Sequence, residues 1–141
     1  MGARRTARER ALQALYQLDM SGGSPADALA AAWESVAQET PPPEPDAVQF
    51  ARELVDGVVS NLRAIDALIE QHSHNWRIDR MDRIDRSVLR LAIFELEYRL
   101  DIPRKVTLNE AVELGKTFGT EASSAFINGL LDRVALALGK K

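Results

Sequence analysis

The chain has 141 residues, of which 45% are hydrophobic and 28% charged, and its formal net charge is −3. These proportions are typical of a folded globular protein and exclude a wholly disordered chain. The absence of cysteine excludes disulfides, thiolate metal sites and a cysteine nucleophile, and it favours a reducing compartment such as the cytoplasm. No apolar run approaches the ~20 residues that cross a bilayer, so we expect no membrane-spanning segment.

Charge is distributed unevenly along the chain. Residues 1–18 carry four arginines against Glu9, a balance of +3, whereas residues 19–70 carry ten acids against two arginines, a balance of −8. A polyanion is steered by local charge rather than by the mean charge of the whole chain. The basic N-terminal segment is therefore a candidate binding surface.

The N-terminal half shows helical periodicity interrupted by strong stop signals. A first helix is predicted over residues 4–19, and Ser21-Gly22-Gly23 ends it. Ser24-Pro25 predicts the start of a second helix, with a hydroxyl cap followed by proline at the first position. This helix is expected to reach about residue 38, before a proline-rich linker over residues 40–45.

The rest of the chain continues the helical pattern. Apolar residues from Phe50 to Ile69 predict one long third helix, and a short turn is expected over residues 76–81. Further helices are predicted from residue 84 to about 100, from a capping box at Thr107, and from Thr120 onward. Since no stretch alternates with strand period, we expect an all-α protein with about seven helices.

No pattern of catalytic or metal-binding residues accompanies these helices. His72 and His74 are the only histidines, and at a spacing of two on a helix their rings diverge. The chain also lacks a glycine-rich phosphate loop and a dinucleotide fingerprint. We expect no enzymatic activity, no metal site and no cofactor.

Two regions have the composition of a phosphate-binding surface. Arg4, Arg5 and Arg8 can share one face at the N-terminus of the first helix, where fixed cations and the helix dipole act together. A solubilising helix tip is the alternative. Residues 116–124 supply Lys116, the aromatic Phe118 and a new helix N-terminus, although Phe118 as an ordinary core residue fits equally well.

A run of acid–base pairs with a period of three covers residues 79–86. A solvated helix face with weak ion pairs is one interpretation, each pair contributing about 0.3–0.5 kcal/mol. A polar docking surface for a protein partner is the other.

The order and spacing of several blocks resemble the NusB family of bacterial transcription antitermination factors. The resemblance covers nearly the whole chain. Its blocks are residues 4–17 (RRTARERALQALYQ), 54–58 (LVDGV), Ile65-Asp66, Trp76 with Arg80, 85–96 (DRSVLRLAIFEL), 102–106 (IPRKV), 109–114 (NEAVEL) and 126–132 (FINGLLD).

The resemblance implies a single NusB-like helical domain over residues 1–141. It would consist of two perpendicular three-helix bundles, an N-terminal one over about residues 1–72 and a C-terminal one over about 75–141. It also implies binding to the single-stranded boxA element of nascent ribosomal RNA together with the ribosomal protein NusE, which helps RNA polymerase in the antitermination complex to resist termination.

The family's functional positions map onto two groups of residues. By resemblance, the RNA-facing residues are Arg4, Arg5, Arg8, Lys116, Phe118, Gly119 and Ser123. The residues implied to face NusE are Tyr16, Asp85 and Arg90.

The resemblance leaves some questions open. Ala122 replaces an acidic residue that is frequent at that position, which puts its contribution to RNA binding in doubt. The related domain of RNA cytosine methyltransferases is an alternative, although those proteins add a Rossmann-type catalytic domain. A helical scaffold that binds only protein is another. The family's monomeric and homodimeric states both remain open.

Overall fold

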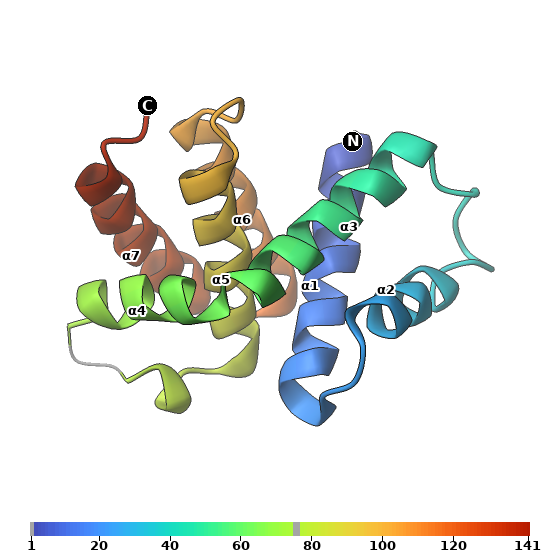
Figure 1. The fold of residues 1–141 in the computed structure, drawn as a ribbon, viewed down its shortest axis with the longest axis horizontal. Coiled ribbons are helices and arrows are strands. Elements are labelled where there is room, and N and C mark those ends of the chain that lie inside the picture. The colour runs from blue at the N-terminus through green and yellow to red at the C-terminus, as the bar shows by residue number, and fades with distance from the viewer. Residues whose placement is uncertain (1, 75–76) are drawn as a thin grey trace. The chain divides into compact units, whose positions relative to one another are not determined.

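The computed structural model describes residues 2–74 and 77–141. Within those residues it contains seven α-helices and one 3₁₀ turn and no strand, which confirms the expected all-α class (Figure 1). The elements are α1 (Ala3–Ser21), α2 (Pro25–Glu34), α3 (Pro45–Ser60), α4 (Leu62–His72), η1 (Ile78–Arg80), α5 (Arg83–Tyr98), α6 (Arg104–Phe118) and α7 (Ser123–Leu138). Trp76, part of the expected turn over residues 76–81, lies outside the described residues.

The chain divides into two compact units, and the first comprises Met1–Ser60. In this unit α1 packs against both α2 and α3. Gly22 and Gly23 adopt positive φ angles of 71° and 102° after α1, and the Ser24 hydroxyl accepts a hydrogen bond from the Asp27 amide at the start of α2. The predicted break between the first two helices is confirmed. The core of the unit comes from small and aliphatic residues, among them Ala7, Ala11, Leu12, Leu29, Ala51, Leu54 and Val58.

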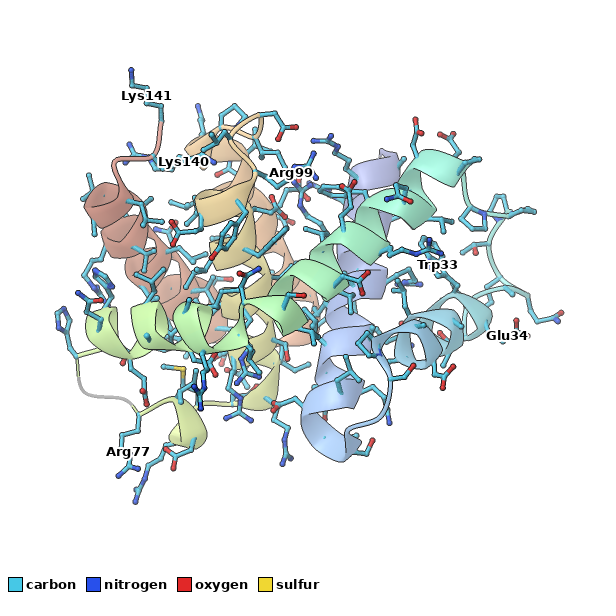
Figure 2. The ribbon with its side chains drawn as sticks, in the orientation of Figure 1. Trp33, Glu34, Arg77, Arg99, Lys140 and Lys141 are labelled. Carbon is cyan, nitrogen blue, oxygen red and sulfur yellow. The ribbon has the colours of Figure 1, made fainter. Side chains whose placement is uncertain are left out.

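The second unit comprises Asn61–Lys141 and is built around α5. This helix packs against α4, α6 and α7, and all its residues from Asp85 to Leu96 are buried except the partly exposed Arg90. Lys140, beyond α7, donates hydrogen bonds from Nζ to the carbonyl oxygens of Glu95 (3.3 Å), Leu96 (3.3 Å) and Arg99 (2.8 Å) (Figure 2). Its ammonium group thereby binds three carbonyls at the end of α5, of which those of Glu95 and Arg99 also accept the amides of Arg99 and Ile102.

The prediction of a single long third helix is wrong, because two helices, α3 and α4, occupy this part of the chain. The helix breaks at Asn61, whose φ and ψ of −118° and 22° are not helical, and the apolar pattern continues on both sides of the break. Periodicity cannot reveal such a break because both segments keep the helical spacing. Beyond the break, α4 packs on α5 and α7, and it therefore belongs to the second unit, which begins at Asn61. The resemblance had implied a first bundle that extends to about residue 72.

Two predicted helix starts are also wrong. The helix expected from a capping box at Thr107 begins at Arg104, and Thr107 is buried, donating from its hydroxyl to Glu95 Oε1 at 3.0 Å. The last helix begins at Ser123 rather than after Thr120. Both threonines match a local capping pattern. In the structure, however, Thr107 donates to the buried Glu95 carboxylate, and the Thr120 amide donates to the Ser123 hydroxyl.

No helix in residues 2–74 and 77–141 combines the length and apolar character needed to cross a membrane.

Candidate nucleic-acid and partner interfaces

The basic N-terminal residues begin α1. Arg4 and Arg5 are exposed on its first turn, and that turn contains no acidic residue. The guanidinium carbon of Arg4 lies 4.6 Å from the centre of the Phe50 ring in α3, and that of Arg8 lies 5.3 Å from the same centre. The structure therefore brings Arg4 and Arg8 together around one aromatic side chain of the first unit.

Arg8 differs from its two neighbours in exposure. Only 4% of its surface is accessible, whereas Arg4 and Arg5 are exposed. Helical spacing placed Arg8 correctly on the face of Arg4, but spacing within α1 does not show that α3 covers this turn. Phe50, itself 4% exposed, was recognised from the sequence only as the first residue of an apolar stripe.

The second sequence-predicted region lies at the end of α6 and the start of α7. Lys116 is exposed and forms an ion pair with Glu113 at 3.6 Å, one turn earlier on the helix. Phe118, the last residue of α6, exposes 43% of its surface, so it is not an ordinary core residue. Lys116 and Phe118 thus place a cation and an aromatic face at the surface of the second unit.

Gly119 and Ser123 form the turn between these helices. Ser123 is fully buried, and its hydroxyl accepts a hydrogen bond from the Thr120 amide at 2.9 Å. A Cβ at Gly119 would come within 2.7 Å of Ser123 Cβ and 2.8 Å of the Gly115 carbonyl oxygen. These two residues hold the turn in place, and the Ser123 hydroxyl does not reach the surface.

Asp85 is the best-defined polar group in the predicted partner surface. It is 9% exposed, it receives a hydrogen bond from Ser123, and its Oδ1 has no hydrogen-bond partner in the described part of the chain. Burial raises the pKa of this carboxyl group; the Ser123 hydrogen bond opposes that rise and the charge of Asp82 adds to it. Ser123 therefore connects the turn before α7 with Asp85 on α5.

A cavity of about 400 Å³ lies beside Asp85 in the second unit. Its lining mixes apolar side chains with one cation and two acids: Arg80, Met81, Asp82, Asp85, Ala122 and Phe126. Ala122 contributes only a methyl group to this lining. The cavity could admit an apolar stem ending in a hydrogen-bond donor, for which the Asp85 oxygen is the natural acceptor.

The other two expected partner residues differ in their surroundings. Tyr16 is partly exposed on α1. The Arg90 guanidinium instead forms a two-point ion pair with Asp66 of α4, with Nε–Oδ1 at 2.8 Å and Nη2–Oδ2 at 2.9 Å. Helical spacing does not reveal this role of Asp66, because the two residues are 24 positions apart in the chain.

The two histidines contribute no recognisable site. The Nδ1 atom of His72 lies 2.9 Å from the carbonyl oxygen of Leu68, which is an ordinary contact near a helix end. In the described ranges, no three acidic or histidine side chains are grouped so that they could hold a metal ion.

Comparison with known proteins identifies close relatives of the chain. The NusB family model matches residues 5–136. The transcription antitermination protein NusB of Myxococcus xanthus is 71% identical over 140 residues, a match that covers 99% of each chain. The protein of the same name from Anaeromyxobacter dehalogenans is 53% identical, over 98% of this chain and 94% of the relative.

Solved structures agree with this relationship. A crystal form of T. maritima NusB is 36% identical, with a TM-score of 0.85 over 94% of this chain and 90% of that one. A second structure contains the antitermination factors NusB and NusE in complex with double-stranded RNA. It is 30% identical, with a TM-score of 0.85 over 96% of this chain and 97% of the matching one.

Proposed function

Because the chain belongs to the NusB family, we propose that it is a transcription antitermination factor that binds boxA-type RNA together with NusE. In this role it acts in the cytoplasm by binding, without catalysis or a cofactor, and helps RNA polymerase resist termination. The observation that carries the proposal is the pair of exposed arginines on the first turn of α1, in a chain whose relative is known in complex with NusE and RNA.

Within the proposed RNA site the residues have unequal tasks. Arg4 and Arg5 meet phosphate groups directly, because both are exposed and a guanidinium group donates two parallel hydrogen bonds to a phosphate. Lys116 contributes a further cation, and Phe118 offers an exposed ring on which a base can stack. Arg8, Gly119 and Ser123 support these contacts from beneath the surface.

The proposed NusE surface includes Tyr16 and Asp85. Asp85 supplies a carboxylate oxygen without a partner beside the 400 Å³ cavity, so a donor group of the protein partner would satisfy it. Arg90 contributes through its ion pair with Asp66, which fixes the surface of α5.

The test is the fluorescence anisotropy of a labelled boxA-type RNA, measured with and without NusE at two salt concentrations. Wild type is compared with Arg4→Ala/Arg5→Ala and with a control of equal charge loss, Arg63→Ala/Arg77→Ala, which removes two exposed arginines outside the proposed site. We expect binding that strengthens with NusE, weakens with salt, and falls strongly in the first variant while the control keeps the wild-type affinity.

Two results would contradict the proposal. If NusE bound but no RNA bound under any condition, the chain would be the protein-only scaffold. If both double variants lost affinity equally, RNA attraction would be a nonspecific effect of charge, and the site on α1 would be wrong.

A further inference from the structure

The ring of Phe50 stands between the N-terminal arginines and the core of the first unit. Two guanidinium groups from successive turns of α1 lie over it, that of Arg4 at 4.6 Å and that of Arg8 at 5.3 Å. These distances are within the ~6 Å at which a cation is attracted to the face of an aromatic ring. The phenyl group is 96% buried, since it is only 4% exposed, so packing holds it in place.

The arrangement addresses a physical problem of a basic helix end. Arg4 and Arg8 are one helical turn apart, where like charges destabilise a helix, and the positive end of the helix dipole adds to the repulsion. An exposed arginine side chain also samples many rotamers, and holding it in one of them costs conformational entropy. A ring face that attracts both guanidinium groups offsets the repulsion and restricts the side chains.

The two arginines have different exposure on this ring. Arg8 is 4% exposed, whereas Arg4 is exposed to solvent. A guanidinium that stacks by its face keeps its N–H donors directed outward in its own plane. Because Arg4 is exposed while its guanidinium carbon lies 4.6 Å from the ring centre, a phosphate can approach it from solvent without removing it from the ring.

We propose that Phe50 is a positioning residue for RNA binding, whose ring holds the Arg4 guanidinium, with Arg8 beside it, in the geometry that receives a phosphate. The inference rests on the proposed RNA-binding function. It assigns to an α3 residue a role that its place in an apolar stripe does not require, because a leucine would fill a core position equally well but lacks the negative ring face.

The test separates the charge distribution of the ring from its bulk. Phenylalanines with one, two and three ring fluorines are incorporated only at position 50; each fluorine weakens the negative ring face while the size of the ring changes little. We expect boxA-type RNA affinity to fall stepwise, about three- to tenfold for the trifluoro ring, with the melting temperature and NusE affinity nearly unchanged.

A matched control uses the same series at Phe94 in α5. Phe94 is also buried, at 8% exposed, but its ring stacks on Tyr98 at 5.4 Å rather than holding the arginines of α1. Fluorination there is expected to leave RNA affinity unchanged. A second control repeats the Phe50 series in an Arg4→Ala background, where fluorination is expected to have little further effect on RNA affinity.

A readout without RNA tests the stack itself. Proton signals of the Arg4 and Arg8 side chains should show upfield ring-current shifts in the wild type and lose them in Phe50→Leu. Unchanged RNA affinity across the fluorinated series, in a wild type that binds RNA with salt dependence, would overturn the positioning role alone. A wild type without salt-sensitive RNA binding would overturn the proposed function and this inference together.

Discussion

Among single residues, Asp85 lowers the stability of the fold, because its burial is not offset by hydrogen bonds to both carboxyl oxygens. Its carboxyl group is buried, and Oδ1 has no partner in the described part of the chain. A buried, unsatisfied polar atom lowers the free energy of unfolding. A residue kept under such conditions is better explained by a group it receives from outside the chain, in agreement with its proposed place on the NusE surface.

The raised pKa of Asp85 predicts how stability changes with pH. The native state binds the proton of the Asp85 carboxyl group more strongly than the unfolded state does. The contribution of Asp85 to the free energy of unfolding is therefore largest below pH 3.8, the pKa of the unfolded state, and it is lost as pH rises through the folded pKa. We expect Asp85→Asn, which cannot ionise but still accepts from Ser123, to gain unfolding free energy relative to wild type as pH rises.

Urea denaturation from pH 3.5 to 7 measures this difference. The control is Asp132→Asn, which replaces an exposed carboxylate on α7. If the difference between Asp85→Asn and wild type stayed constant across the range, the carboxyl group would not be perturbed by burial.

At the scale of elements, the connection between α6 and α7 depends on the absence of a side chain at position 119. We expect Gly119→Ala to lower the free energy of unfolding by about 1–3 kcal/mol, because the new methyl group collides with Ser123 and the Gly115 carbonyl. The variant should also bind RNA more weakly, since Phe118 precedes this turn directly.

Gly129→Ala is the matched control for this substitution. Gly129 lies inside α7, and a Cβ there would meet only the Arg133 side chain at 3.7 Å. Helix propensity then favours alanine by up to about 1 kcal/mol. If urea denaturation gave the same change in the free energy of unfolding for both substitutions, close packing would not be the reason for glycine at position 119.

The ion pair between Arg90 and Asp66 joins α4 to α5. Both side chains are largely buried, with 13% and 23% exposed, and the geometry is bidentate. We expect a coupling energy of about 1 kcal/mol in a double-mutant cycle of Arg90→Ala and Asp66→Ala. A coupling near zero would mean that the pair does not hold α4, and that Arg90 is available for a protein partner instead.

Helical spacing predicts the all-α class and which residues share a helix face better than it predicts which side chains of different helices are in contact. Helical spacing correctly placed Arg4 and Arg8 together and ended α1 at Gly22. It missed Phe50 over the arginines and Asp66 on Arg90, because both contacts join residues far apart in sequence. The burial of Ser123 could not be predicted from spacing either, because it depends on the close approach of Gly119 in the turn before α7.

At the scale of the whole molecule, the position of each charge matters more than the total. Residues 1–60 sum to −4 and residues 61–141 to +1, although the first unit contains Arg4 and Arg5, two of the three cations proposed to meet phosphates. A mean negative charge repels RNA at long range, so binding depends on the few cations that make contact.

This limited set of contacts predicts a modest salt dependence. With Arg4, Arg5 and Lys116 each neutralising one phosphate, the logarithm of the binding constant should fall with the logarithm of salt concentration with a slope of about −2. Arg4→Ala/Arg5→Ala should make the slope shallower by about 1.4. Titrations at five salt concentrations give both values, and a wild-type slope steeper than about −5 would require a much larger phosphate surface.

The tight turn at Gly119 also has a consequence for how this sequence can diverge. Any side chain at position 119 needs room that only a smaller neighbour or a displaced helix could provide, and the nearest atoms belong to Ser123 and Gly115. The Gly115 atom is a backbone oxygen that no substitution removes, so only position 123 or the placement of α7 can provide that room. Among relatives, we expect departures from glycine at position 119 to occur together with a change at position 123 or a shifted start of the last helix, rather than as independent substitutions.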